Sequence, residues 1–298
     1  MKINSKVSKY LRKLKLLRFA DQIRFYYTWL RMYKKNKKFR SIHPDTKLPK
    51  DYLMYESFLL DYDGYYNGGK VTAEWIIGLI RNHKQIKHKK ILDWGCGPGR
   101  VIRHMPTLLE ESNQFFATDY NEDSIDWCSK NIDHIDFKTN HLSPPLRYEN
   151  DFFDIIYGIS IFTHLSEKMH TEWINELRRV LKKDGILIVS LQGNNFKSKL
   201  TPSELKEFTN GKLVIRGNTK EGHRMYSAFH PEAFVKYLFR DFTILDHIVY
   251  SDDLAKSNIS QDVWVIKKII YNMICIYCLM IHMEIQIEIH CLSRNENL

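Results

Sequence analysis

A glycine-rich stretch occupies residues 91–100 and reads Ile91-Leu92-Asp93-Trp94-Gly95-Cys96-Gly97-Pro98-Gly99-Arg100. Its apolar start predicts a short strand over 89–93, and a helix is expected to follow over 100–111. Glycine permits a tight turn between the two and lets the backbone approach a ligand more closely than any Cβ would allow. Free N–H groups at the start of a helix favour a polar ligand at the same place. The stretch therefore predicts a ligand-binding turn between a strand and a helix.

A second acidic residue supports this interpretation. Asp119 ends the next predicted strand, over 114–119, as Asp93 ends the first. The carboxyl ends of parallel strands face one crevice, where a carboxylate can accept hydrogen bonds from both hydroxyls of a ribose. A glycine corner alone can be purely structural, but strand, turn, helix and acid together favour a nucleotide-like ligand. The rival is a nicotinamide-dinucleotide enzyme, whose fingerprint requires Gly or Ala where Arg100 stands.

The alternation of strand and helix continues along the chain. Helices are expected over 123–132, 167–181 and 230–240, and Pro231 suits the first turn of the last one. Strands are expected over 135–138, 153–160, 186–191, 242–250 and 262–267. This order predicts an α/β fold with a Rossmann-like, doubly wound and mostly parallel sheet.

Taken in order, these segments resemble class I S-adenosylmethionine-dependent methyltransferases. The glycine stretch with Asp93 before it is similar to the first motif of that family, and residues 116–119 (Phe-Ala-Thr-Asp) are similar to the second. Residues 151–157 resemble the fourth motif. Residues 177–185 resemble the helix exit R-x-L-K-P-G-G, with Asp184-Gly185 in place of Pro-Gly-Gly. The resemblance covers residues 89–191 and implies S-adenosylmethionine as the cofactor.

The resemblance also assigns roles to individual residues. Asp93 would orient the glycine loop, and Asp119 would bind the ribose. The methionine part of the cofactor would lie along Gly95, Cys96, Gly97 and Gly99. Where the family often has an acid near the adenine, this chain has Asn140 followed by His141, and the amide oxygen of Asn can accept a hydrogen bond from the adenine amino group.

The candidate catalytic residue is His164, which follows the predicted strand 153–160 at the crevice. Methylation of an oxygen requires a base to remove its proton, and histidine suits that task near neutral pH. The alternative is that Thr163 and His164 only shape the turn into the next helix. Weaker candidates of the same kind are His223, Tyr226 and His230. No metal site is expected, because Cys275 and Cys278 form a lone C-x-x-C pair.

The charge of the chain is unevenly distributed. Residues 1–50 hold 16 lysines and arginines against two aspartates, a net charge of +14, whereas the other 248 residues hold 29 against 33, a net charge of −4. A helix is expected over 5–35, with one apolar stripe made of Leu16, Phe19, Ala20, Ile23, Tyr26, Tyr27, Leu30 and Tyr33. We expect residues 1–40 to lie on an anionic surface, the inner leaflet of a membrane above all. Two alternatives are that the stripe packs on the catalytic domain as a lid, or that the arm binds RNA.

Three parts of the chain are distinguished: a basic amphipathic arm and linker (1–50), a methyltransferase domain (51–268) with an insertion over the active site (193–229), and a hydrophobic tail of no assigned role (269–298). Five scattered cysteines and the absence of a signal peptide favour the cytoplasm, with peripheral attachment to the inner membrane.

Three functions are open. The first is O-methylation of a small molecule or a cell-envelope glycan. Residues 160–165 and the helix near them resemble methyltransferases that act on such acceptors. The second is an RNA methyltransferase that uses the basic arm, and the third is a non-catalytic protein with the cofactor fold. The slightly acidic body disfavours nucleic acid, since its cleft would repel phosphates.

Overall fold

The computed structural model describes residues 17–58, 60–109, 112–249 and 259–269. The described residues up to Lys268 form one compact unit. The predictions for residues 5–16, and for the tail after Ile269 with its Cys275–Cys278 pair, lie outside the described residues.

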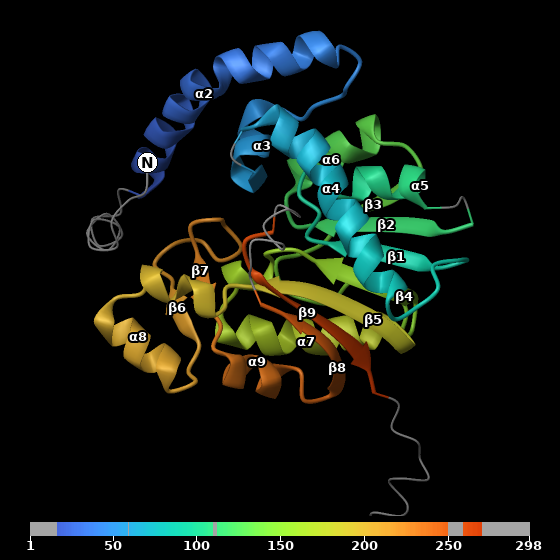
Figure 1. Ribbon diagram of the computed structural model, residues 1–298, viewed down its shortest axis with the longest axis vertical. Helices are drawn as coiled ribbons and strands as arrows, with labels where there is room; N and C mark the ends of the chain where they lie inside the picture. The colour runs from blue at the N-terminus through green and yellow to red at the C-terminus, as the bar shows by residue number, and fades with distance from the viewer. Residues whose placement is uncertain (1–16, 59, 110–111, 250–258, 270–298) are drawn as a thin grey trace, which may run out of the picture. The chain divides into compact units, whose positions relative to one another are not determined.

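A seven-stranded sheet forms the centre of the described part, in the order β3-β2-β1-β4-β5-β9-β8 (Figure 1). The strands are β1 (Lys90–Trp94), β2 (Gln114–Asp119), β3 (Ile135–Thr139), β4 (Phe153–Gly158), β5 (Leu181–Leu191), β8 (Phe242–Ile248) and β9 (Asp262–Lys268). Neighbours from β3 to β5 pair in parallel, while β9 pairs antiparallel with both β5 and β8. The predicted mostly parallel α/β sheet is confirmed.

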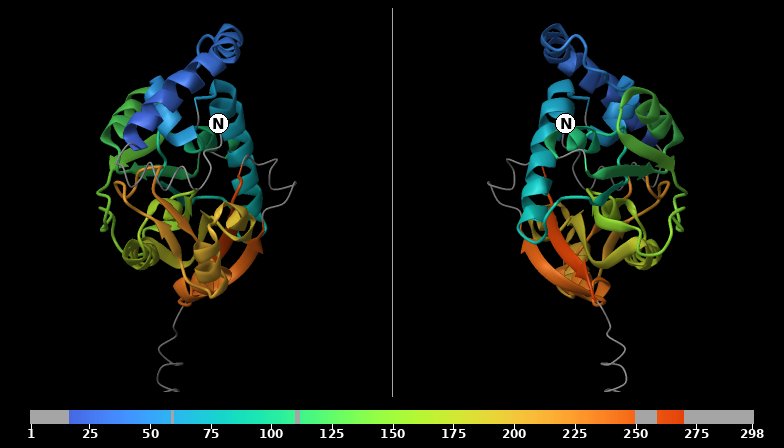
Figure 2. Two further views of the ribbon diagram at one scale, coloured as in Figure 1. Left: turned by 90° about the vertical axis from the view of Figure 1, so that its left-hand side faces the viewer. Right: turned by 90° about the vertical axis from the view of Figure 1, so that its right-hand side faces the viewer.

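Helices cover both faces of the sheet, as the near-continuous apolar run in β4 requires. Alternate residues of β4 point to opposite faces: Ile155 and Tyr157 pack with α4 (Tyr62–Arg81) and α6 (Glu122–Asn131), and Ile156 packs with α7 (Glu167–Val180) and α9 (Glu232–Leu238). The side views of Figure 2 show α4 and α7 on opposite sides of the sheet. This two-sided core fixes the strand ends that carry the site.

The prediction of one helix over residues 100–111 is wrong. The chain instead forms a single 3-10 turn, Ile102–His104, and one short helix, α5 (Met105–Leu108), after which Leu109 is extended. Pro106 lacks an N–H group and cannot continue a helical ladder that begins before it. The helices predicted over 123–132 and 167–181 are confirmed within one residue at each end as α6 and α7.

Residues 193–229 fold into elements of their own. They are a 3-10 helix η3 (Asn194–Lys199), α8 (Pro202–Thr209) and a two-stranded antiparallel sheet of β6 (Val214–Arg216) and β7 (Ser227–Phe229). A small separate core holds them together, made of Phe196, Phe208, Val214 and Phe229.

The arm is helical in its described part, where α2 runs from Leu17 to Ile42 and thus past the expected end at residue 35. Its inward face packs on α3 (Asp51–Phe58) and on the start of α4. Polar contacts fix this face: the Asn36 amide donates to the carbonyl of Leu60, and Trp29 Nε1 donates to Asp51 Oδ2. Phe25 and Phe39 join the same core.

The predicted apolar stripe faces solvent instead. Six of its eight members are 51 to 68% exposed: Phe19, Ile23, Tyr26, Tyr27, Leu30 and Tyr33. Ala20 is half-buried, and Leu16 lies outside the described residues. The alternative in which this stripe covers the catalytic domain is therefore wrong, because the buried polar contacts hold the opposite face against the body. None of the helices in the described ranges is long and apolar enough to cross a membrane.

Candidate functional site

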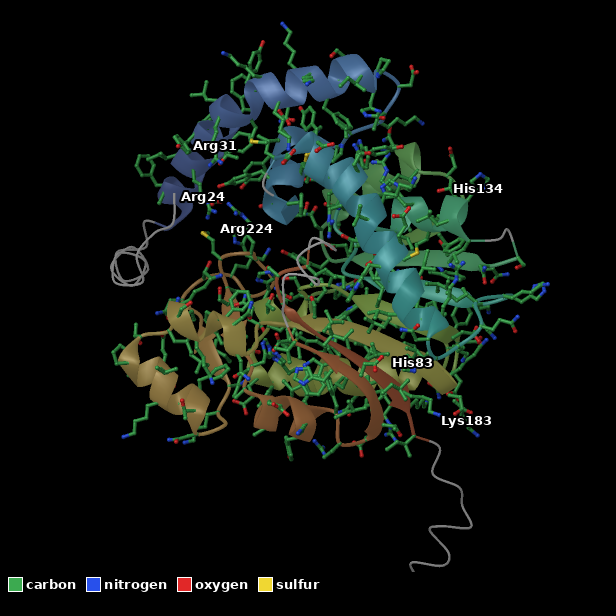
Figure 3. All side chains as sticks on the ribbon, in the orientation of Figure 1. Arg24, Arg31, His83, His134, Lys183 and Arg224 are labelled. Carbon is green, nitrogen blue, oxygen red and sulfur yellow. The ribbon has the colours of Figure 1, made fainter. Side chains whose placement is uncertain are left out.

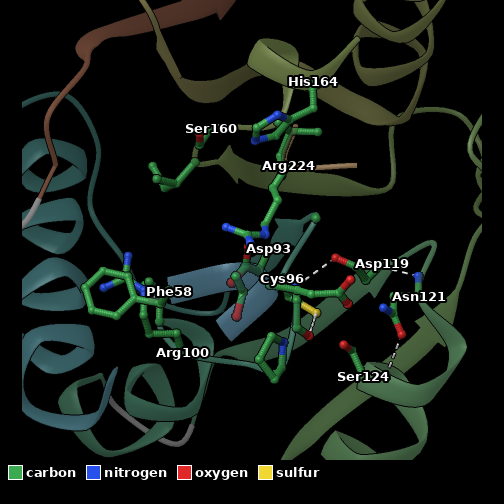
Figure 4. A pocket seen from close by; sticks show the side chains of 18 of the residues that line it. Phe58, Asp93, Cys96, Arg100, Asp119, Asn121, Ser124, Ser160, His164 and Arg224 are labelled. Atoms are coloured by element: carbon green, nitrogen blue, oxygen red, sulfur yellow. Dashed lines mark hydrogen bonds between the residues drawn. The ribbon is translucent and has the colours of Figure 1, made fainter. Parts of the chain in front are cut away.

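A cavity of about 400 Å³ opens where β1, β2 and β4 end (Figure 4). The glycine loop and Asp119 form one part of its wall, and α3 contributes another with Leu53, Glu56, Ser57 and Phe58. The remaining wall comes from the loop after β4, from Gly222, His223 and Arg224, and from residues 259–261. The carboxyl ends of the parallel strands thus face this cavity, as they do in other doubly wound sheets.

The glycine loop has the tight turn that its sequence predicts. Gly95 has a φ of +76°, and a Cβ at this position would lie 2.2 Å from Ile161 Cδ1. The amides of Gly95 and Cys96 both donate to the carbonyl of Thr118 at 2.8 and 3.0 Å, which joins the turn to β2. Any side chain at residue 95 would therefore collide with the wall of the cavity.

Asp119 forms the acidic corner of the cavity. Its Oδ2 accepts from the Gly97 amide and its Oδ1 from the Asn121 amide, each at 2.8 Å. Burial raises the pKa of this carboxyl, and the backbone donors oppose that rise. Each carboxylate oxygen keeps a second lone pair, so the group can still accept two hydroxyls.

Asp93 lies deeper, with its Oδ2 accepting from the Tyr157 hydroxyl at 3.0 Å. Burial raises its pKa to about 7, although Tyr157 and the Arg100 charge act in the opposite direction. Arg100 is held over the Phe58 ring at 4.5 Å and donates to Thr72 Oγ1 at 3.2 Å. A buried acid and a half-buried guanidinium therefore face the same cavity.

A second, smaller cavity of about 60 Å³ adjoins the first and shares Asp119, Tyr120 and His164 with it. Asn140 lies in its wall. The Asn140 Nδ2 donates to the carbonyl of His141 at 2.5 Å, and its Oδ1 is buried without a hydrogen-bond partner. An acceptor in this state suits a ligand that supplies an N–H group, because a buried polar atom left unpaired is costly.

These features fit S-adenosylmethionine. An unpaired amide oxygen suits the adenine amino group, and the free lone pairs of Asp119 suit the ribose hydroxyls. The glycine loop exposes its backbone where the methionine part would lie. A Cβ built at Gly97 would point into open space, with Ser57 Cβ as its nearest neighbour at 3.5 Å.

Other predicted residues lie elsewhere or behave differently. Gly99 does not line either cavity, because a Cβ there would point at Ile132 and Cys128. His141 is also absent from the walls of both cavities, whereas Cys96 lines the larger one. Sequence reasoning missed the contributions of α3, Arg100, Tyr120, Arg224 and Gln261. Of these, Arg100 and Tyr120 stand beside recognisable motifs, the first and the second respectively.

His164 lines both cavities. Its Nδ1 lies 2.8 Å from the carbonyl oxygen of Tyr226, and a carbonyl can only accept. Nδ1 therefore carries the proton of the neutral ring, and Nε2 is the atom that can take up a proton. Burial lowers the pKa of His164, so the neutral ring is the stable form at pH 7.

The three weaker candidates differ in their surroundings. His223 lines the larger cavity, but its Nδ1 accepts from the Met225 amide at 3.2 Å and its Nε2 lies 3.6 Å from Glu56 Oε1. Tyr226 contributes its carbonyl to His164. His230 lies away from both cavities, with its Nε2 at 2.8 Å from His170 Nε2 in the core. Within the described ranges, no three His, Cys, Asp or Glu residues are arranged to hold a metal ion.

Comparisons with known proteins agree with this geometry. A family model described as a methyltransferase domain matches residues 91–185. An S-adenosylmethionine-dependent methyltransferase from Methanosarcina mazei is similar in structure, with a TM-score of 0.50 and 22% identity over 64% of this chain and 97% of that one. A protein from Pyrococcus horikoshii has a TM-score of 0.52 and 18% identity over 72% and 98% of the two chains. At these identities the two structures show the shared fold, and the family match adds the activity. The chain is an S-adenosylmethionine-dependent methyltransferase.

Proposed function

We propose that the enzyme methylates a hydroxyl group of a small molecule or a cell-envelope glycan, with His164 as the general base. The observation that carries this proposal is the hydrogen bond from His164 Nδ1 to the Tyr226 carbonyl, which leaves Nε2 to accept a proton beside the cofactor cavity. The bound cofactor supplies a methyl group on a positively charged sulfur. The protein contributes orientation of the two reactants and removal of the hydroxyl proton.

The cofactor would be held by the residues that face the two cavities. Asp119 would accept the ribose hydroxyls, and Asn140 Oδ1 would accept the adenine amino group. Gly95, Cys96 and Gly97 would line the methionine part, and Asp93 would orient their loop. Gly99 and His141 would then act through the backbone, since their side-chain positions face away from the cavities.

The part of the wall that these contacts leave over combines apolar side chains, such as Leu53, Phe58 and Ile259, with polar and charged ones. Glu56 lies near His223, Arg224 is paired with Asp21, and Ser57, Ser260 and Gln261 add neutral groups. Paired charges and neutral hydrogen-bonding groups suit a polyhydroxylated acceptor. Near this part of the wall the cations Arg100 and Arg224 accompany the carboxylate of Glu56, so it is the net charge of −4 outside residues 1–50 that disfavours RNA.

Transfer of labelled methyl groups tests this function. The protein and S-adenosylmethionine labelled in its methyl group are incubated separately with envelope carbohydrate, small metabolites and total RNA. We expect the label in carbohydrate or metabolites and stable to mild alkali, as an ether is and an ester is not. Label in RNA would support the alternative, and cofactor binding without transfer to any fraction would support a non-catalytic protein. The Asp119→Ala variant serves as the control for cofactor-dependent transfer.

We further infer that the arm holds the enzyme on an anionic membrane surface, at the inner leaflet. The outward face of α2 carries Phe19, Tyr26, Leu30 and their neighbours in one exposed stripe. Arg24 and Arg31 are exposed cations on the same helix (Figure 3), and no acidic side chain in the described residues pairs with them. Exposed aromatic residues beside unpaired cations are typical of helices that lie in a membrane interface.

Vesicle binding tests the membrane inference. Replacing Tyr26 and Leu30 by Ser should weaken binding to anionic vesicles by roughly tenfold or more, because each removes an apolar side chain from the interface. Co-sedimentation with phosphatidylserine vesicles at low salt measures it. Tyr237→Ser is the matched control, since Tyr237 and Tyr26 are both 65% exposed but Tyr237 lies on α9. Equal sedimentation of the double variant and the control would contradict the membrane inference.

A further inference from the structure

Asp21 joins the arm to the wall of the active-site cavity. This carboxylate is buried on the inward face of α2, where it accepts a hydrogen bond from the Tyr55 hydroxyl at 3.1 Å and pairs with the Arg224 guanidinium. The guanidinium also lies 4.0 Å from the centre of the Tyr55 ring. Figure 3 shows Arg224 between α2 and the body. Residues 203 positions apart in the chain are thus in direct contact.

Arg224 belongs to a segment of residues 220–226 that we call the cavity loop. Gly222, His223 and Arg224 of this loop line the larger cavity. The body holds the loop from one side: the Gly222 amide donates to the carbonyl of His164 at 2.9 Å, and the Tyr120 hydroxyl donates to the carbonyl of Gly222 at 3.1 Å. The arm and α3 hold it from the other side, through Asp21 and Tyr55.

The cavity loop also sets the orientation of His164. The carbonyl that accepts from His164 Nδ1 is that of Tyr226, two residues after Arg224. A short chain of contacts therefore runs from Asp21 through Arg224 and the loop backbone to the imidazole of His164. The carbonyl of His164 in turn accepts a hydrogen bond from the Gly222 amide, so the loop makes two hydrogen bonds to this residue.

The ion pair joins a buried carboxylate to a half-buried guanidinium. The side chains of Arg224 and Asp21 are 16% and 9% exposed, and Arg224 Nε is buried without a partner. Removing one member of a buried pair leaves the other charge without compensation, which costs far more than the loss of an exposed pair. When Asn replaces Asp21, Arg224 loses its counter-charge. We then expect its guanidinium to turn toward water and the cavity loop to move with it.

We propose that Asp21 is a positioning residue, which holds the cavity loop through Arg224 and thereby fixes the proton-accepting orientation of His164. The arm is then part of the active site, although none of the described residues of α2 lines the cavity. The catalytic consequence rests on the proposed role of His164, whereas the effect on the loop does not.

The test uses the full-length protein with S-adenosylmethionine bound and needs no acceptor. In Asp21→Asn, we expect amide hydrogen exchange in residues 220–226 to become at least about tenfold faster, with β4 and β5 unchanged. The ¹⁵N NMR signals of His164 should change from the Nδ1-protonated form to a mixture of tautomers. Asp21→Glu should restore most of both properties. Arg24→Gln, which removes an exposed cation of the same helix that pairs with no acid in the described residues, should change neither.

Three results would overturn the proposal: unchanged exchange and tautomer in Asp21→Asn, exchange that rises equally in β4 and β5, or an equal change in Arg24→Gln. If Asp21→Asn does not fold, Arg224→Gln tests the same contact from the loop, with the same expected changes. Because neither readout involves methyl transfer, a negative result in the labelling experiment leaves this test unaffected.

Discussion

We expect Asp119→Ala to bind S-adenosylmethionine roughly 10- to 150-fold more weakly than the unchanged protein, because a hydrogen bond to a charged group contributes about 1.5–3 kcal/mol. The carboxylate is buried and lines both cavities, and each of its two oxygens accepts one backbone amide at 2.8 Å. Water cannot replace this acceptor as well as it could at an exposed site. Titration calorimetry of the purified protein with the cofactor measures the change directly.

The same side chain also holds the Gly97 amide, so loss of affinity could arise from a loosened loop. Asp119→Asn separates the two causes, since its single amide oxygen can keep one of the backbone contacts but loses the charge. Its affinity should lie between those of the unchanged protein and Asp119→Ala. Asp126→Ala is the control, because Asp126 is an exposed acid on the next helix, where it pairs with Lys130. Unchanged cofactor affinity in Asp119→Ala would show that the ribose is bound elsewhere.

Much of the fold follows from local pattern. The apolar run of β4 and the periodic helix α7 are each determined by residues close in sequence, and both were predicted within two residues of their bounds. The failure at residues 100–111 comes from Pro106, whose effect on a short apolar segment outweighs its helical periodicity. The orientation of α2 could not be predicted from periodicity, because both of its faces carry aromatic residues. Buried polar partners such as Asn36 decide which face turns inward.

The residues of the site also fall into two groups, those that the sequence pattern predicts and those that it does not. Asp93, Gly95, Asp119 and Asn140 all stand at the carboxyl ends of parallel strands, so topology alone brings them together. Glu56 and Arg224 come from a helix before the first strand and from a loop within 193–229, and no spacing rule links either to the glycine motif. The part of the cavity opposite the glycine loop is thus made by segments that no local pattern ties to the cofactor motif. For this reason the sequence predicts the cofactor but leaves the methyl acceptor open.

The second large effect is expected at His164. His164→Asn can still donate to the Tyr226 carbonyl but cannot accept a proton near neutral pH, so kcat should fall by about 10²- to 10⁴-fold, with cofactor affinity nearly unchanged. In the unchanged protein, burial lowers the pKa of His164 from its ordinary value of 6.5. A lowered pKa keeps the ring neutral, and therefore able to accept a proton, at more acid pH. The acid limb of the kcat/KM profile should consequently lie below pH 6.5, and it should be absent in His164→Asn.

These measurements use whichever acceptor fraction takes up the labelled methyl group. His223→Asn is the matched control, because His223 lines the same cavity while its Nδ1 is engaged by the Met225 amide and its Nε2 is directed to Glu56. We expect this variant to lose less than about tenfold in kcat and to keep the acid limb. If His164→Asn retains near-normal turnover, or if the acid limb moves with His223 instead, His164 is not the base. The contact between His164 Nδ1 and Tyr226 would then serve only to close the cavity loop.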